Sequence, residues 1–233
     1  NRGPSPLEGG SRGVSFSEIG RFAGVEASDW SWGVNIADFD NDGYPDIFIT
    51  NGIVKDLLDQ DYTDFYFVPE RMREIYHEKG EVIKELIDNI PSVPIPNCLF
   101  SQEGDLQFTN VSTEWGLGTP GFSTGSAYGD LDNDGDLDLV VSNNNMPPFV
   151  YRNDNQNSSG HFINISLTGT KENTKAIGSQ VTLYCKDRIF FQELYPMRGS
   201  MSSVDPRLHF GLGEFTSIDS LEMRWPDSRI TRA

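Results

Sequence analysis

Two short stretches of the sequence crowd carboxylates at the same spacing. Residues 38–46 read DFDNDGYPD and residues 130–138 read DLDNDGDLD, so acidic side chains stand at positions 1, 3, 5 and 9 of both. Carboxylates this close do not all ionise cheaply unless something neutralises them. A hard divalent cation does so, and calcium accepts roughly six to eight oxygen ligands in flexible geometry. We call these stretches the first loop and the second loop.

The spacing predicts how each loop would surround an ion. Side chains at positions 1, 3 and 5 turn toward one centre as the chain curls, and glycine at position 6 permits the sharp turn. Position 7 offers its backbone carbonyl, and position 9 closes the shell. We therefore expect two structural Ca²⁺ ions, held by Asp38, Asp40, Asp42, Tyr44 and Asp46 in the first loop and by Asp130, Asp132, Asp134, Asp136 and Asp138 in the second.

Other interpretations of the loops are weaker. An EF-hand needs a glutamate at position 12 and a helix on each side, whereas Ile49 and Val141 stand there within strand-like runs. Magnesium is disfavoured because it keeps its waters and takes few carboxylates. The alternative without metal is a tight turn stabilised by Asp and Asn side chains.

The rest of the sequence offers no catalytic constellation. His77, His161 and His209 are scattered, and no G-x-S-x-G motif or phosphate-binding loop occurs. Carboxylates saturated by calcium would leave no open coordination position for chemistry. We expect no catalytic residue and no enzymatic activity.

Charge and hydropathy limit the partners. The formal net charge of −17 disfavours nucleic acid and anionic membranes, since both bind basic surfaces. Two divalent cations would bring this charge to −13. The sequence has no run of about 18 apolar residues, so we expect no membrane span. Cys98 and Cys185 could be two free thiols or one bridge.

The two loops belong to an internal repeat. Residues 16–51 align without a gap on residues 108–143, with 11 identities in 36 positions. Each copy has a short alternating segment (FSEIG at 16–20, FTNVS at 108–112), a stretch of small residues, the loop, and a compact apolar run. This punctuation by Gly, Asn and Asp is typical of short β-strands.

The segment between the copies changes character. From Val68 to Ile90, apolar residues recur at the spacing of an amphipathic helix. Pro69 suits a first helical turn, Gly80 marks a break, and the prolines of residues 91–97 end the segment. We expect a helical insertion at 54–95 that serves as a binding surface or as a structural cap.

A second, smaller β domain is expected after a polar linker at 153–160. Strand-like runs follow at 161–169, 179–185, 188–195 and 220–225. No closing apolar strand is visible after residue 229, and the chain begins with Asn1, so we expect a piece of a longer protein. The expected division is a first repeat at 1–53, the insertion at 54–95, a second repeat at 96–155, and a β-sandwich-like domain at 160–233.

These stretches resemble two known families. The loops, with their Phe, Gly and strand flanks, resemble FG-GAP/VCBS repeats of integrin-alpha-type β-propellers, and residues 96–111 and 149–155 resemble the linkers between such repeats. NTKAIGSQVTLY (173–184), HFGLG (209–213) and LEMRWPDSR (221–229) resemble the ASPIC/UnbV domain. The resemblance implies a mainly β fold with partial propeller-like repeats, and the same ligands in both loops. A closed propeller has about seven blades, whereas two repeats are present here.

The resemblance also implies an extracellular, cell-surface or periplasmic location, which agrees with calcium loading at extracellular concentrations. We expect a calcium-stabilised, non-enzymatic recognition or adhesion module whose ligand, a protein or a glycan, the sequence does not identify. Two alternatives stay open. One is a purely architectural module that caps a propeller, and the other is a propeller enzyme whose active site lies outside this chain.

Overall fold

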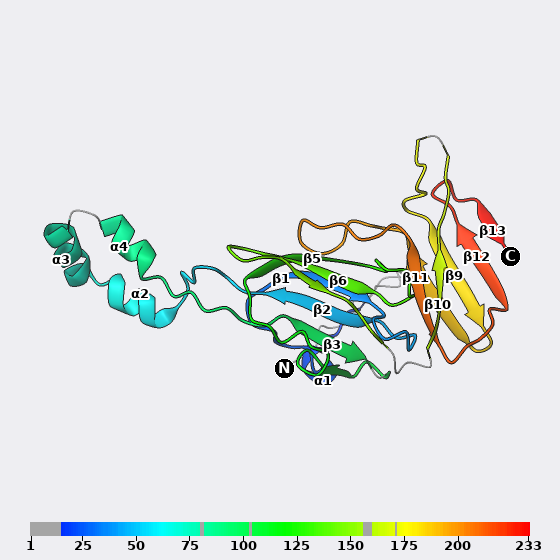
Figure 1. Cartoon of the computed structure of the whole chain (residues 1–233), viewed down its shortest axis with the longest axis horizontal. Helices are drawn as coiled ribbons and strands as arrows, with labels where there is room; N and C mark the ends of the chain where they lie inside the picture. Colours follow the sequence, from blue (N-terminus) through cyan, green and yellow to red (C-terminus); the bar gives the residue numbers. More distant parts are fainter. Residues whose placement is uncertain (1–14, 80–81, 103, 156–159, 171) are drawn as a thin grey trace, which may run out of the picture.

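The computed structural model describes residues 15–79, 82–102, 104–155, 160–170 and 172–233. Within these residues the chain is mainly β, and its strands pair antiparallel in four sheets without forming a closed barrel. Figure 1 shows two sheets at the centre, a helical arm on one side and the C-terminal sheets on the other. None of the described helices is both long enough and apolar enough to cross a membrane.

Two central sheets contain the repeated segments. The first sheet consists of β1 (Ser31–Ala37), β2 (Asp46–Asn51), β3 (Cys98–Gln102) and β4 (Phe108–Asn110), in this spatial order. The second consists of β5 (Ser123–Gly129), β6 (Asp138–Asn143) and β7 (Phe149–Tyr151). β5 and β6 begin and end 92 residues after β1 and β2, so the shift seen in the sequence is also a shift between matching strands.

The first strands of the two central sheets, β1 and β5, are the inner strands. They lie next to each other, and the two sheets share a core. Asn35 on β1 donates through Nδ2 to Ser126 Oγ on β5 at 2.7 Å. The apolar runs after both loops face inward from the two sheets, which is why hydrophobic residues follow the acidic ones so abruptly. The buried hydrophobic cluster contains Phe39, Phe48, Leu99, Val111, Leu117, Leu137, Leu139 and Val141.

A buried serine also holds the first sheet. Ser112 Oγ accepts a hydrogen bond from the backbone N–H of Leu99 at 2.7 Å. We expect Ser112→Ala to lower the free energy of unfolding by about 1 to 2 kcal/mol, because a buried N–H loses its acceptor. Urea denaturation measures this change. Thr109→Ala at an exposed site on β4 is the control, and an equal effect of both variants would refute the assignment.

The helical arm leaves the first sheet between β2 and β3. It contains α2 (Gln60–Tyr66), α3 (Pro69–Lys79) and α4 (Val82–Asp88). α3 begins at Pro69, while Gly80 lies outside the described residues. α2 lies within the expected insertion but before the apolar stripe of Val68 to Ile90. Its N-cap signal is in the sequence: the Asp59 side chain accepts from the N–H of Tyr62 at 2.7 Å. The Tyr62 hydroxyl donates to the carbonyl of Leu86, which ties α2 to α4.

The expected strand at residues 16–20 is wrong. These residues form no strand, and Gly20–Ala23 form the helical turn α1. Phe16 is 93% exposed, and Gly24 ends the turn in the left-handed region at φ 79°. A side chain, and not a backbone ladder, connects this segment to the residue before β4: Gln107 Nε2 donates to the carbonyl of Phe22. Alternation over five residues does not specify a strand when no backbone ladder forms.

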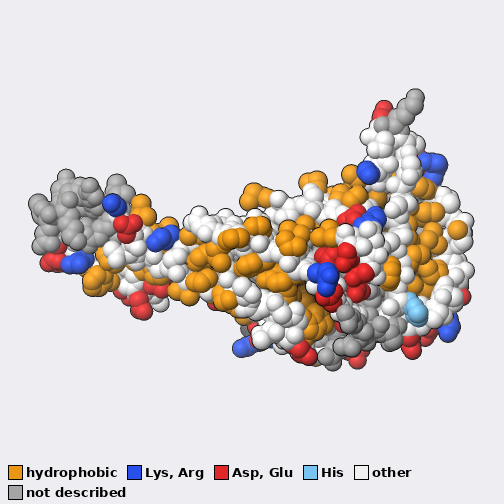
Figure 2. Space-filling view, viewed as in Figure 1, with side chains coloured by type: hydrophobic (Ala, Val, Ile, Leu, Met, Phe, Trp, Pro, Cys, Tyr) orange, Lys and Arg blue, Asp and Glu red, His pale blue; other side chains and the backbone are white. Residues whose placement is uncertain are grey.

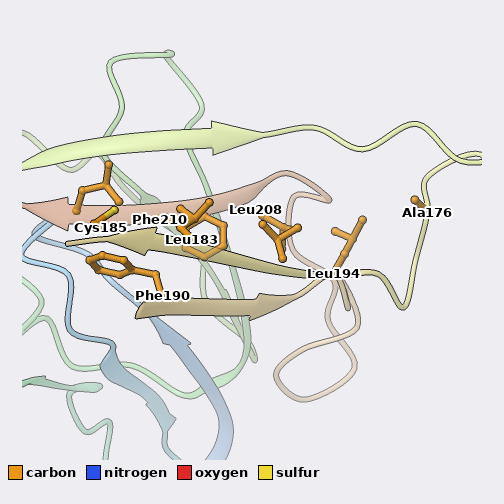
Figure 3. Packing of buried hydrophobic residues seen from close by; sticks show 9 residues of the cluster. Ala176, Leu183, Cys185, Phe190, Leu194, Leu208 and Phe210 are labelled. Atoms are coloured by element: carbon orange, nitrogen blue, oxygen red, sulfur yellow. The ribbon is translucent and has the colours of Figure 1, made fainter. Parts of the chain in front are cut away.

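The C-terminal unit, residues 160–233, has two sheets around a second core. One sheet consists of β10 (Arg188–Glu193), β9 (Gln180–Cys185), β12 (Ser220–Arg224) and β13 (Ile230–Arg232), and the other of β11 (Leu208–Gly213) and β8 (His161–Ile165). Figure 3 shows the buried side chains of this core, with Leu183, Phe190 and Phe210 on different strands. β13 pairs with β12, so a short strand does follow residue 229, contrary to the expectation. Both cysteines are free thiols.

Candidate metal centre

The two loops are matching connections between the first two strands of each central sheet. The first joins β1 to β2 and the second joins β5 to β6, and each is closed by a strand pair, Ala37 with Asp46 or Gly129 with Asp138. Positions 4 and 6 adopt the left-handed region in both loops, with φ 61° and 89° in the first and 64° and 96° in the second. Asn and Gly occupy these positions because they reach that region at low cost.

The carboxylates at positions 1, 3 and 5 converge in both loops. Each of Asp38, Asp40 and Asp42 offers an oxygen within 4.8 Å of the others, and the same holds for Asp130, Asp132 and Asp134. Within the described residues, these two groups are the only sets of three or more acidic, His or Cys side chains that could hold a metal ion. The convergence expected from the spacing is therefore present.

The position 1 carboxylates each carry one unpartnered oxygen. Asp38 is 9% exposed and Asp130 is 7% exposed, and the Oδ1 atom of each is buried without a hydrogen-bond partner. A buried carboxylate oxygen without a donor is costly. A cation among positions 1, 3 and 5 of each loop would satisfy the unpartnered oxygen of that loop. The donor set therefore fits a hard, oxygen-coordinated ion such as Ca²⁺.

Burial raises the pKa values of the first loop. Desolvation, followed by the charge of Asp42, raises the pKa of Asp38 to about 8. Desolvation also raises the pKa of Asp46 to about 7 and that of Asp42 to about 6. The folded loop thus favours neutralised carboxyls, which protons or a metal ion can supply.

The position 9 carboxylates act as backbone braces, which the sequence reasoning missed. Asp46 accepts from the N–H of Phe39 at 2.9 Å and from the N–H of Gln102 at 3.1 Å, one bond on each oxygen. Asp138 repeats this pattern with Leu131 and Asn153. Asp46 therefore ties the start of the first loop to the end of β3, and Asp138 ties the start of the second loop to the chain just after β7. Their ligation of an ion stays a prediction, since each oxygen keeps a second lone pair.

Position 7 differs between the loops. The N–H of Tyr44 donates to Asp42 Oδ1 at 2.7 Å, and the N–H of Asp136 donates to Asp134 Oδ1 at 3.0 Å. The Asp136 side chain points to the other loop, where its Oδ1 accepts from Asn41 Nδ2 at 2.8 Å. The expected metal contact at this position is the backbone carbonyl, and it stays a prediction.

Residues distant in sequence complete the surroundings. Arg188 Nη2 donates to the carbonyl of Gly43 at 2.5 Å, and its guanidinium lies 4.0 Å from the centre of the Tyr44 ring. Arg207 Nη2 donates to the carbonyl of Asp130 at 2.9 Å. Figure 2 shows acidic side chains gathered where the central sheets meet the C-terminal unit. Only the tertiary structure brings these arginines to the loops, so no local sequence signal identified them.

His209 lies between the first loop and β8, where it contacts Asn41 and Asn164. It is buried, and desolvation lowers its pKa to about 4, so the ring is uncharged at neutral pH. Nε2 lies 2.7 Å from Asn41 Oδ1 and Nδ1 lies 2.9 Å from Asn164 Oδ1. Among the described residues, it belongs to no metal-binding group.

Calcium binding at the first loop is expected to weaken as the pH falls from 8 to 6. Calcium must displace protons from Asp38 and Asp46, whose pKa values stand near 8 and 7. The Asp130→Asn variant alters a position 1 ligand of the second loop, so that calorimetry reports on the first loop alone. In this variant we expect the Kd for calcium to rise roughly tenfold or more as the pH falls from 8 to 6, measured at pH 6, 7 and 8.

Without calcium, the free energy of unfolding is expected to fall as the pH rises, which is opposite to the trend in calcium affinity. The stability that Asp38 contributes is present below its ordinary pKa of 3.8 and is lost as the pH rises through about 8. Chemical denaturation in EDTA measures this trend. A calcium affinity that does not change with pH would contradict proton competition.

Comparison with known proteins adds independent information. The family model described as ASPIC and UnbV matches residues 169–233. The chain is 26% identical over 245 residues to cartilage acidic protein 1 of Xenopus tropicalis, covering 93% of this chain and 37% of that protein. It is 29% identical over 133 residues to cartilage acidic protein 1 of Mus musculus and of Homo sapiens, covering 55% of this chain and 20% of each relative.

The chain thus spans well under half the length of these relatives. The family match contains the segments 173–184, 209–213 and 221–229 that suggested the same family from the sequence. The C-terminal part of this chain is therefore similar to the ASPIC and UnbV family, and the chain as a whole is similar to cartilage acidic protein 1.

Proposed function

We propose that this chain is a calcium-stabilised, non-enzymatic recognition module. The observation that carries the proposal is the matched pair of loops, each with three converging carboxylates and one buried, unpartnered oxygen at position 1. One Ca²⁺ in each loop would neutralise the carboxylates and fix the connection between two core strands. Its role would be structural, with binding coupled to folding.

Direct calcium titration tests the metal sites. Calorimetry on the 233-residue chain is expected to give two calcium ions per chain, with magnesium binding far more weakly. Asp38→Asn and Asp130→Asn should each remove one ion, since each alters one position 1 ligand. Asp64→Asn, on the helical arm, is the control and should keep both. Absence of calcium binding at millimolar concentration would refute the metal sites.

We further propose that the two central sheets are successive FG-GAP/VCBS repeats of a propeller-like array. In this division, residues 1–53 and 96–155 are the repeats, 54–95 is an insertion, and 160–233 is an ASPIC/UnbV-like domain. The adjacent inner strands β1 and β5 and the equal spacing of β1–β2 and β5–β6 support this division. An experimental structure of a longer form of the protein would test it by showing whether further sheets continue the array.

We also propose a recognition role and an extracellular location. The similarity to proteins named cartilage acidic protein 1 supports a secreted or cell-surface module. The proposed calcium sites would be loaded at extracellular calcium concentrations. Binding screens of the full-length protein against glycan arrays and cell-surface proteins test the role. A calcium-dependent ligand whose binding is lost when residues 54–95 are replaced by a short linker would assign it to the arm. Empty screens would favour the architectural alternative.

A further inference from the structure

The C-terminal unit covers both loops. The N–H of Gly213 donates to the carbonyl of Asn41 in the first loop at 3.0 Å. Arg188 and Arg207 reach the carbonyls of Gly43 and Asp130, one in each loop. The contacts go to backbone carbonyls of the loops themselves, so the docking surface and the proposed metal sites share residues.

Glycines on both sides make this approach close. At position 6 of the second loop, a Cβ on Gly135 would overlap the ring of Phe162, and at the same position of the first loop Gly43 faces Arg188 and Phe190. From the other side, a Cβ on Gly211 would overlap the carboxylate of Asp38. This explains the glycine at position 211 in HFGLG, where β11 passes directly over the first loop.

A chain of side chains links the two loops through the C-terminal unit. Asn41 in the first loop contacts His209 on β11, and it also contacts Asp136 in the second loop. His209 also contacts Asn164, whose Nδ2 lies 3.4 Å from Asp130 Oδ2. Phe162 stacks on His209, with ring centres 5.6 Å apart. Movement of either loop would therefore disturb contacts at the other.

We propose that calcium in the two loops controls the docking of the C-terminal unit onto the central sheets. This inference rests on the proposed calcium sites. Three carboxylates repel one another when no ion lies between them, so calcium favours the loop conformation that presents these carbonyls. By linkage, docking must strengthen calcium binding by the same factor as calcium strengthens docking.

Hydrogen exchange measured by mass spectrometry on the 233-residue chain tests the docking. In EDTA, amides at the contact, in residues 41–44, 133–136 and 211–214, are expected to exchange at least tenfold faster than in calcium. Amides of β9, inside the C-terminal core, should stay protected, which separates undocking from unfolding. Equal protection of the contact residues in both conditions, with two calcium ions bound by calorimetry, would overturn the docking proposal alone.

A variant outside the loops tests the linkage. Phe162→Ala, on β8, removes the uncharged ring that lies against Gly135 of the second loop, and it is expected to weaken calcium binding about fivefold or more. Ile230→Ala, a truncation on the distant edge strand β13, is the control and should keep the affinity. An unchanged calcium affinity in Phe162→Ala would overturn the linkage, whereas absence of calcium binding in the unmodified chain would overturn both this inference and the proposed function.

Discussion

Calcium at 10 mM is expected to raise the melting temperature of this chain by about 10 °C over the same protein in EDTA. Calcium sites of extracellular modules have Kd values of roughly 0.1 to 1 mM. Binding to the folded state alone then stabilises it by about 2 kcal/mol for each loop. Two loops give about 4 kcal/mol, and a chain of this size gains about 2 to 4 °C per kcal/mol.

Matched variants separate calcium binding from general stability. Asp42→Ala and Asp134→Ala remove the position 5 carboxylate from the first and the second loop, and each is expected to lose about half of the calcium-dependent shift. In EDTA, both should melt close to the unmodified chain, since each deletion also removes like-charge repulsion. Magnesium at the same concentration should give a much smaller shift. A melting temperature that does not respond to calcium would identify the loops as metal-free turns.

The loops were predictable because their structure is local. Acidic residues at alternate positions, followed by glycine and an apolar run, determine a curled connection between two strands regardless of what lies nearby. The repeat was also predictable, since its constant shift of 92 residues appears in both the sequence and the strand boundaries. The segment at 16–20 was predicted wrongly because its secondary structure depends on whether its backbone pairs with the edge of a neighbouring strand.

The surroundings of the loops were not predictable for a physical reason. Arg188 and Arg207 contact backbone carbonyls, which every residue carries, so the sequence does not mark the acceptor. Gly211 belongs to the HFGLG motif of the sequence, but the reason for a glycine there, the nearby Asp38 carboxylate, appears only in three dimensions. Contacts between residues so far apart in the sequence leave no periodic trace.

Asp46 illustrates why spacing alone overstates a ligand's role. From the sequence, position 9 closes the metal shell. In the structure, both oxygens of this fully buried carboxylate accept backbone hydrogen bonds, from Phe39 at the start of the first loop and from Gln102 at the end of β3. The same side chain therefore holds β3 to the loop, whether or not an ion is bound.

Asp46→Ala is therefore expected to destabilise the chain with or without calcium. It leaves two buried N–H groups without acceptors, each costing about 1 to 3 kcal/mol, and relief of repulsion from Asp40 and Asp42 offsets part of this. We expect a net loss of about 2 to 4 kcal/mol, measured by urea denaturation in calcium and again in EDTA.

Asp38→Asn is the matched control, because its remaining oxygen can still accept from the N–H of Gly43, the partner of Asp38 Oδ2 at 2.8 Å. It should lose stability only in calcium, since it removes a ligand without removing a backbone acceptor. The two variants thus distinguish a brace from a ligand within one loop. If Asp46→Ala were as stable as the unmodified chain in EDTA, the backbone bonds of Asp46 would contribute little, and position 9 would act through the ion alone.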